Sequence, residues 1–339
     1  MDNVNTACIG TGYWGKNLVR NFYNLPGCRL RVCCDLDPDL LAKNAILYPG
    51  VSLTQDYSQV LEDPSVDAVV LASPAVKHYE MAKLALEAGK HAYVEKPLTL
   101  SADDAEELCE IAEARGLVLM VGHLMEYHPG VRKLKQLVED GSLGDIHYLY
   151  AQRLNLGIIR KDENALWSLA PHDVSIALYL LGQEPDTVSA RGESYLQPGI
   201  EDVVFCNLHF KNRAMAQIQV SWLDPHKIRQ ITVVGSQKMA VFDDVEATEK
   251  IRIYDKGVNG NDYASYGDAL TLRTGDITIP KIDMTEPLKT ECEHFLSCIK
   301  EGKTPRSDGR DGLRVVKVLE AAQKSLKNNG VPVGLNGAS

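Results

Sequence analysis

The sequence predicts an α/β protein, in which a doubly wound parallel sheet is followed by an α+β domain with a mostly antiparallel open sheet. Its 339 residues suit two folding units of ordinary size. As far as Gly122, short apolar runs alternate with amphipathic helical stretches, and strands joined by crossover helices must pair in parallel. Beyond Gly122, turns of hairpin length join the strands. We therefore expect one domain over residues 1–122 and a second over residues 123–339.

The first domain is predicted from strands and helices that alternate along the chain. Its apolar runs are residues 6–9, 30–34, 68–72, 92–94 and 117–121. Apolar side chains spaced three and four residues apart predict helices around Leu18, Leu84 and Leu108, and Ser101 is a suitable N-cap for the last of these. Such alternation is typical of a parallel sheet with helices on both faces.

The second domain shows a different pattern. A predicted helix over residues 128–140 leads into residues 146–150, which alternate as in a half-buried strand. Further strands are expected at residues 203–210, 216–222, 231–234, 240–242 and 251–254. A turn such as 211–213 is short enough for a hairpin. Helices over 286–300 and 310–327 complete an antiparallel sheet that has helices on one face.

The composition excludes several classes of protein. The 36 basic and 46 acidic side chains leave a net charge of −10, which repels nucleic-acid phosphates and anionic membrane surfaces. The eight cysteines lack the paired spacing of a disulfide scaffold or a zinc site, so we expect reduced thiols. The nine histidines show no His-Glu-x-x-His pattern, and we expect no metal. With no signal-like leader and no run of about 18 apolar residues, the expected location is cytoplasmic.

A glycine-rich loop follows the first predicted strand. The run Gly10-Thr11-Gly12-Tyr13-Trp14-Gly15 opens the first helix, whose N-terminus offers unpaired N–H groups to a pyrophosphate. Asp35 follows the second strand, twenty residues after Gly15, where a carboxylate can accept hydrogen bonds from the ribose hydroxyls. The alternative is that the glycines only form a turn and that Asp35 only begins a loop. Because the acid repels a 2′-phosphate and Leu36 offers no arginine, the pattern favours NAD over NADP.

The segment Glu95-Lys96-Pro97 follows the strand at 92–94, at the carboxyl edge of the sheet where ligands of such folds bind. Burial beside a positively charged nicotinamide would lower the pKa of Lys96 toward a value useful for acid–base catalysis. The preceding peptide bond of Pro97 is a candidate for the cis form. Taken alone, Glu95 and Lys96 would be interpreted as a solvated charge pair before a proline turn.

These features, with Ser73-Pro74, His78 and the run Leu169-Ala170-Pro171-His172, resemble the Gfo/Idh/MocA family of NAD(P)-dependent oxidoreductases over nearly the whole chain. The resemblance implies a Rossmann domain, then a domain whose open sheet carries the substrate and often the oligomer contact. It places the family's catalytic pair on Lys96 and His172. It implies an NAD site made by Gly10, Thr11, Gly12, Tyr13, Trp14, Asp35, Ser73, Pro74, His78, Glu95 and Lys96.

The sequence itself supports a role for His172. Pro171 suits a first helical turn, so we expect His172 at a helix N-terminus, which disfavours the imidazolium and leaves a neutral ring. We expect Asp173 to be a first-turn acid. A histidine satisfied by local backbone is the alternative. The chain departs from the family pattern at Ser168 and Ser175, where aspartates are common, and at Glu126, which occupies the position of a frequent arginine.

A narrower resemblance, to sugar-nucleotide 3-dehydrogenases that act on UDP-N-acetylglucosamine or its uronic acid, comes from residues 153–157, 162–167, 221–229 and 304–309. It implies a UDP-sugar substrate, a homodimer or homotetramer, and a pathway aminotransferase that consumes the product. Cations could neutralise the diphosphate, or could be solvated strand-flanking charges. The expected substrate-binding residues are Tyr127, Arg153, Asn155, Arg160, Asn164, Lys227 and Arg229. A free-sugar or inositol dehydrogenase and a non-catalytic nucleotide-sensing module are the rival interpretations.

Overall fold

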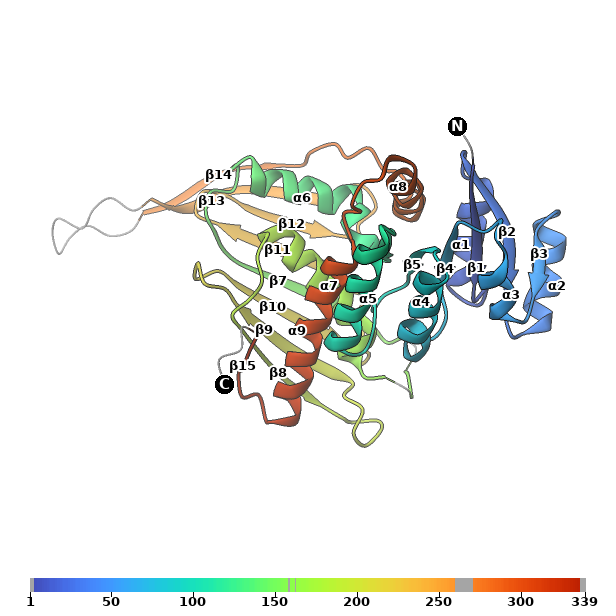
Figure 1. Ribbon diagram of the computed structural model, residues 1–339. Helices are drawn as coiled ribbons and strands as arrows, with labels where there is room; N and C mark the ends of the chain where they lie inside the picture. Colours follow the sequence, from blue (N-terminus) through green and yellow to red (C-terminus); the bar gives the residue numbers. More distant parts are fainter. Residues whose placement is uncertain (1–2, 158, 162, 260–270, 336–339) are drawn as a thin grey trace. The chain divides into compact units, whose positions relative to one another are not determined.

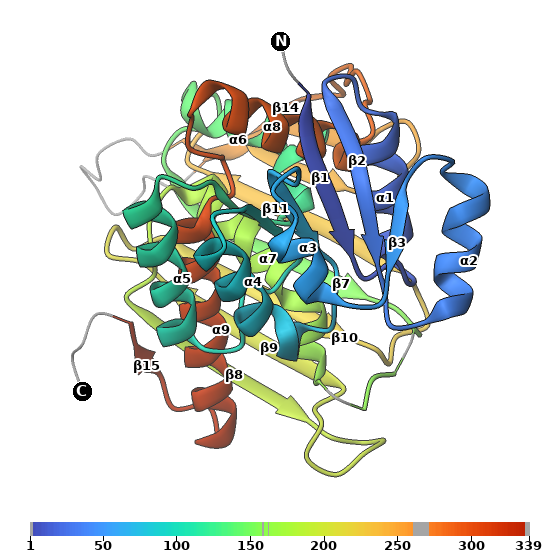
Figure 2. The same ribbon diagram turned by 45° about the vertical axis from the view of Figure 1, so that its right-hand side comes forward.

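The computed structural model describes residues 3–157, 159–161, 163–259 and 271–335, shown from two sides in Figures 1 and 2. Contacts divide the chain into two compact units. The first comprises Met1–Tyr127 with Thr285–Lys317, and the second His128–Met284 with Val318–Ser339. The return of the late segment to the first unit was not predicted. The expected division into functional domains after residue 122 stays a prediction.

The first unit contains a six-stranded sheet in which every neighbouring pair is parallel. Its strands are β1 (Val4–Ile9), β2 (Cys28–Cys34), β3 (Ser52–Thr54), β4 (Ala68–Leu71), β5 (His91–Val94) and β6 (Leu119–Val121). The order is β3-β2-β1-β4-β5-β6, which confirms the predicted doubly wound sheet. Sequence analysis missed β3, because three residues that include Ser52 and Thr54 make no apolar run.

Helices cover both faces of this sheet. They are α1 (Gly15–Asn24), α2 (Pro38–Leu47), α3 (Tyr57–Glu62), α4 (His78–Glu87), α5 (Ala102–Arg115) and α8 (Pro287–Glu301), with 3₁₀ turns η1 (Ala75–Lys77) and η2 (Leu124–Tyr127). Right-handed crossovers that run in opposite directions from the centre place α1 and α4 on opposite faces. Helix α8 packs against α1 and β1, and its Phe295 ring meets Phe22 and Tyr93 edge-on at 6.3 and 5.8 Å between centroids.

The second unit is a nine-stranded sheet, antiparallel except where β7 pairs with β10. Its strands are β7 (Ile146–Leu154), β8 (Thr187–Glu193), β9 (Val203–His209), β10 (Met215–Ser221), β11 (Ile228–Gly235), β12 (Met239–Asp243), β13 (Ile251–Asn259), β14 (Thr271–Thr278) and β15 (Val333–Gly334). The mostly antiparallel sheet was predicted. Strands β8, β14 and β15 were not.

Helices α6 (Pro129–Glu139) and α7 (Ala165–Leu181) pack on one face of this sheet, as Figure 1 shows. Along β7, Leu149 and Ala151 are buried toward the helices, while Tyr148 points to the opposite face and is 40% exposed. The long helix α9 (Gly309–Lys327) begins in the first unit and ends in the second. One face of the sheet is therefore covered and the other carries half-exposed side chains, as expected for an open sheet.

Two sequence expectations concern the whole described chain. All eight cysteines lie in described segments and none forms a disulfide, which confirms the predicted thiols. Among the described residues, no helix is both long and apolar enough to cross a membrane.

Candidate active site

Each of the three glycines between β1 and the start of α1 has a different structural role. Gly10 has φ of +82°, and a Cβ there would lie 2.7 Å from the Ala72 carbonyl oxygen. A Cβ on Gly15 would lie 1.9 Å from the Gly10 carbonyl oxygen. A Cβ on Gly12 would meet no described atom within 4 Å, so this backbone is open to a close-lying ligand. That division of roles fits a pyrophosphate held over the start of a helix.

Asp35, directly after β2, is bonded to the same loop. Its Oδ2 accepts hydrogen bonds from the Thr11 backbone N–H at 2.6 Å and from the Thr11 hydroxyl at 3.1 Å. Its Oδ1 accepts the Asp37 N–H at 3.0 Å. Asp35 therefore shapes the glycine loop in addition to its predicted ribose contact. Leu36 beside it is 82% exposed, so an apolar surface flanks the acid.

Glu95 links the glycine loop to Lys96. The Glu95 carboxylate is buried, and it accepts the Trp14 indole N–H at 2.5 Å and the Lys96 backbone N–H at 3.2 Å. Burial raises the pKa of Glu95, while the Trp14 hydrogen bond and the charge of Lys96 oppose that rise. The Lys96–Pro97 peptide bond is cis. Glu95 and Trp14, both predicted as cofactor contacts, thus bond to each other and hold two loops of the site together.

The loop after β4 supplies the third edge of the site. Its Ser73 hydroxyl oxygen is buried and has no hydrogen-bond partner among the described residues, so it is available to a ligand. Pro74 is exposed at the same turn, as is Tyr13 across the glycine loop. His78, predicted as a cofactor contact, is 1% exposed and has both ring nitrogens against backbone carbonyls. The open Gly12 backbone and the unpartnered Ser73 hydroxyl fit a bound dinucleotide.

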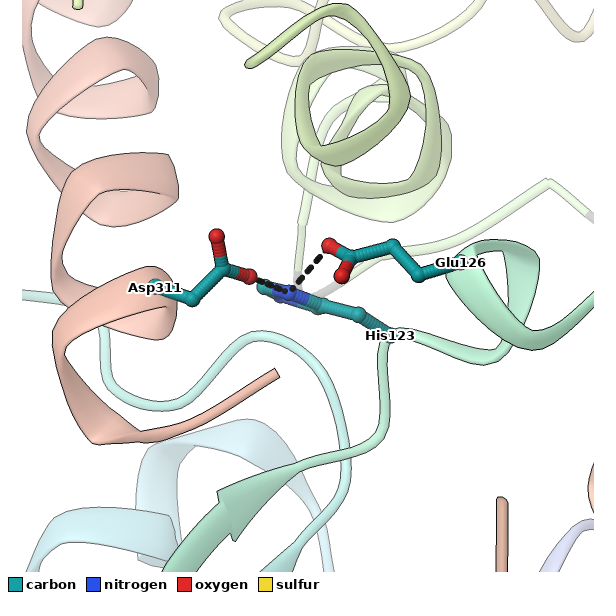
Figure 3. A group of neighbouring side chains, drawn as sticks. All are labelled: His123, Glu126 and Asp311. Carbon is teal, nitrogen blue, oxygen red and sulfur yellow. Dashed lines mark hydrogen bonds and ion pairs between the residues drawn. The ribbon is translucent and has the colours of Figure 1, made fainter. Parts of the chain in front are cut away.

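A buried cluster of charged side chains lies just beyond the end of β6 (Figure 3). His123 Nδ1 lies 2.7 Å from Asp311 Oδ2 and 3.6 Å from Glu126 Oε1, and all three side chains are almost fully buried. Burial opposes the imidazolium, but the hydrogen bonds and charges of Asp311 and Glu126 outweigh it and raise the pKa of His123 to about 10. Arg314 donates to Asp311 Oδ1 at 2.6 Å. His123 and Arg314 therefore balance the charges of Asp311 and Glu126. A histidine and two carboxylates are also residue types that can bind a metal ion.

This cluster explains the departure at Glu126. Its side chain is 1% exposed and contributes to the interior of the first unit. The adjacent Tyr127, expected to bind substrate, is also 1% exposed, and its hydroxyl lies 2.9 Å from Ser307 Oγ. Tyr127 is therefore a core residue of the first unit, which does not support its expected contact with the substrate. Its partner Ser307 belongs to the segment Thr285–Lys317, which joins the first unit from late in the sequence. The residues next to Tyr127 in the chain therefore could not reveal its burial.

Helix α7 of the second unit corrects the predicted setting of His172. The helix begins at Ala165, where the Asn164 side chain caps it by accepting the Trp167 N–H at 3.2 Å. Pro171 therefore lies inside the helix, and His172 is not at a helix N-terminus. The argument that a helix dipole keeps its imidazole neutral was wrong. An Asn three residues before Trp167 is a cap signal that the sequence analysis could have used.

Asp173 is likewise not a first-turn acid. Its carboxylate accepts Arg153 Nε at 2.7 Å and Arg153 Nη2 at 3.0 Å, and both side chains are buried. This bidentate pair joins α7 to β7 directly beside His172. Arg153 is committed to Asp173, so its expected contact with a diphosphate is not supported.

Two of the remaining predicted substrate residues have partners within the second unit. Asn164, besides capping α7, donates hydrogen bonds to Glu201 at 2.6 Å and to Gln323 at 2.9 Å. We therefore infer that its role is structural. Arg160 is half-exposed and pairs with Glu163 at 3.2 Å.

The sheet brings three of the others together at one end. Asn155 directly follows β7, and Arg229 on β11 is the register partner of Arg153 on β7. Arg229 is partly exposed and lies 3.6 Å from Asp244. Lys227, just before β11, is exposed. Asp162, which contributed to the narrower resemblance, lies outside the described residues.

Family models match both parts of the chain. Residues 4–123 match an oxidoreductase family with an NAD-binding Rossmann fold, and residues 131–241 match the GFO/IDH/MocA C-terminal domain. The doubly wound parallel sheet, its glycine loop and the family match over residues 4–123 together show an NAD-binding oxidoreductase. The chain belongs to the Gfo/Idh/MocA family of oxidoreductases.

Relatives with characterised substrates are distant. The scyllo-inositol 2-dehydrogenase (NAD(+)) of Bacillus subtilis (strain 168) is 28% identical over 98% of this chain and 96% of that protein. The UDP-N-acetylglucosamine 3-dehydrogenase of Acidithiobacillus ferrooxidans is 29% identical over 74% of this chain and 76% of its own length. A solved structure of the latter enzyme has a TM-score of 0.81 at 26% identity, covering 97% of this chain and 99% of that one.

Proposed function

We propose that this protein is an NAD-dependent dehydrogenase that oxidises the C3 hydroxyl of a UDP-sugar, with UDP-N-acetylglucosamine as the first candidate substrate. The observation that carries the proposal is the place of Lys96 at the carboxyl edge of the sheet, tied through Glu95 and Trp14 to the open glycine loop. The choice of sugar is supported by the motifs at residues 153–157 and 221–229 and by the UDP-N-acetylglucosamine 3-dehydrogenase relative.

In the proposed reaction, Lys96 is the base that accepts the proton of the C3 hydroxyl, and the hydride on C3 would pass to bound NAD⁺, which leaves a ketone. Removal of a proton by a positioned base typically contributes about 10²–10⁴-fold to a rate. NAD⁺ held at the glycine loop would supply the hydride acceptor. We assign His172 to hold or share the same proton, and the Arg153–Asp173 pair to fix the segment of α7 that carries it.

The diphosphate is proposed to meet the cations that remain exposed in the second unit. Lys227 and Arg229 lie together at the start of β11, near Asn155 at the end of β7. Arg160 is a further exposed cation. The diphosphate of a UDP-sugar carries two negative charges that such side chains recognise.

The test is to mix the protein with NAD⁺ and UDP-N-acetylglucosamine, its uronic acid, or scyllo-inositol, and to follow absorbance at 340 nm. An aminotransferase that consumes 3-keto sugars is added, because product inhibition can hide turnover. NADH formation with UDP-N-acetylglucosamine alone supports the proposal. Turnover of inositol without any UDP-sugar would overturn it in favour of the inositol dehydrogenases, and turnover of the uronate alone would move the substrate to the acid.

The Lys96→Met variant tests the proposed base. It should keep NADH binding, measured by fluorescence, and lose turnover with the active substrate by at least about 10²-fold. Turnover close to that of the unaltered protein would remove Lys96 from the mechanism. A homodimer or homotetramer, a cytoplasmic location and a partner aminotransferase complete the proposal.

A further inference from the structure

His78 lies between two loops of the active site. It is the first residue of α4, and the loop before that helix contains Ser73 and leads out of β4. The neighbouring strand β5 ends just before Glu95, and Lys96 and Pro97 follow. The side chain of His78 thus stands where the ends of two adjacent parallel strands meet, at the edge where Lys96 emerges.

The imidazole of His78 contacts both loops through their backbone carbonyls. Nδ1 lies 2.7 Å from the Pro97 carbonyl oxygen, and Nε2 lies 2.9 Å from that of Ser73. The residue is 1% exposed. Since both ring nitrogens are occupied by the protein, the ring has none left to bind a cofactor or a substrate.

We propose that His78 is a positioning residue for Lys96, which fixes the Pro97 carbonyl against the Ser73 loop and so sets the course of the turn from which the Lys96 side chain leaves. The inference rests on the proposed role of Lys96 as the base. It replaces the expected contact of His78 with the cofactor. A shift of about 1 Å in a reacting group can cost about 10²-fold in rate. A buried contact one residue away from Lys96 is therefore expected to affect the rate of the reaction.

One of the two contacts dominates. A neutral imidazole carries a single N–H and can donate to one carbonyl only. Burial lowers the pKa of His78 and the charge of Lys96 acts in the same direction, while the hydrogen bonds to the Pro97 and Ser73 carbonyls oppose that shift. We take the shorter contact, at 2.7 Å, as the one in which Nδ1 donates to the Pro97 carbonyl.

Lys96 is the charged group that faces the ring from the turn after β5. On its own segment, Lys77 and Glu80 pair with each other at the surface. Because Pro97 directly follows Lys96, the contact with the Pro97 carbonyl is the one that acts on the Lys96 turn.

Two neutral amides separate the contacts. In His78→Asn the amide nitrogen stands near the place of Nδ1 and can still donate to Pro97. In His78→Gln it stands near the place of Nε2 and can reach only Ser73. The two variants share their charge and chemistry, and each serves as the other's control. Thermal unfolding and NADH fluorescence on each full-length variant establish that it folds and binds cofactor.

The first readout needs no substrate. Competitive acetylation of the NADH-bound protein, read by mass spectrometry, reports the reactivity of Lys96 relative to exposed Lys43 on α2. His78→Asn should leave this ratio unchanged, and His78→Gln should alter it by about tenfold, which is the value of one buried hydrogen bond of about 1.4 kcal/mol. Equal ratios in the two variants would overturn the inference, and so would a larger change in His78→Asn.

The second readout is turnover with the substrate identified by the 340 nm assay. The kcat of His78→Gln should fall at least about tenfold, with NADH affinity unchanged, while His78→Asn stays within about threefold of the unaltered protein. Loss of NADH affinity in step with kcat would show that His78 acts through the cofactor and contradict the inference. Lys96→Met is measured in parallel, and normal turnover by this variant would contradict the proposed function. If Lys96→Met is inactive but His78→Asn and His78→Gln have the same kcat, only the inference about His78 is contradicted.

Discussion

The two units bury charge in different ways. In the second unit, Arg153 and Asp173 form a bidentate pair between β7 and α7. In the first unit, His123 lies between Asp311 and Glu126 (Figure 3). A guanidinium keeps its charge at any pH that a protein survives, whereas an imidazolium exists only while it holds a proton. The second unit therefore depends on the geometry of its pair, and the first depends on geometry and on pH.

The largest expected effect comes from breaking the pair in the second unit. Asp173→Asn replaces two charged acceptors by one neutral acceptor and leaves the buried Arg153 guanidinium unbalanced. The free energy of unfolding should fall by about 3–5 kcal/mol. Urea unfolding followed by tryptophan fluorescence measures it, since Trp167 and the fully buried Trp222 both lie in this unit.

Lys77→Gln is the control for that measurement, because Lys77 pairs with Glu80 at the surface. It should change the free energy of unfolding by no more than about 0.5 kcal/mol. A loss below about 1 kcal/mol for Asp173→Asn would show that the buried pair is not held in solution as the structure has it.

The next effect is the pH dependence of the first unit. The pKa of His123 is raised to about 10 in the folded protein, above its ordinary value of about 6.5 in an unfolded chain. The stabilisation is therefore complete below about pH 6.5 and is lost as the pH rises through about 10. His123→Gln should be less stable than the unaltered protein near neutral pH, and this difference should shrink at alkaline pH.

Melting temperatures measured from about pH 6 to about pH 10 test this difference. The Arg153–Asp173 pair provides the internal contrast, because Asp173→Asn should be destabilised by a similar amount across the same range. Parallel pH curves for His123→Gln and the unaltered protein would mean that His123 is not an imidazolium in the fold.

The contrast also shows which parts of the site the sequence could predict. The glycine loop, Asp35 and Lys96 were placed correctly at the ends of strands, because each is signalled by residues next to it in the chain. His123 and Asp311 are 188 residues apart, so no local pattern could join them. Without knowledge of that contact, the sequence shows at Glu126 only a departure from the arginine that is frequent at this position in the family.

Helix α7 was misplaced for a different reason. A proline inside a helix removes a hydrogen bond and is normally unfavourable, so Pro171 was taken as a helix start. The structure keeps it in the helix interior, where α7 packs against β7, β9 and β10. Burial of a long apolar face outweighs the local cost of one proline, and the balance between them is invisible without the sheet.

Trp14→Phe tests a third kind of buried charge, one stabilised by a neutral donor. The Glu95 carboxylate would lose the indole N–H and keep the Lys96 N–H. Stability should fall by about 1–3 kcal/mol, and NADH affinity should fall as well, because the glycine loop loses its link to the turn of Lys96. Tyr13→Phe is the control, since Tyr13 is 80% exposed and should change stability little. If fluorescence titration found equal NADH affinity in both variants, the link would have no part in binding.

The smallest expected effect on stability, and the most informative about the site, is that of Gly12→Ala. The new methyl group meets no described atom within 4 Å, so folding should change by no more than about 0.5 kcal/mol, while the methyl occupies the space where a pyrophosphate approaches the backbone. Gly15→Ala is the matched contrast, because its Cβ would fall 1.9 Å from the Gly10 carbonyl oxygen and the loop must shift. We expect Gly12→Ala to keep its melting temperature and lose NADH affinity at least about tenfold, and Gly15→Ala to lose both. NADH affinity that survives in Gly12→Ala would place the dinucleotide away from this loop.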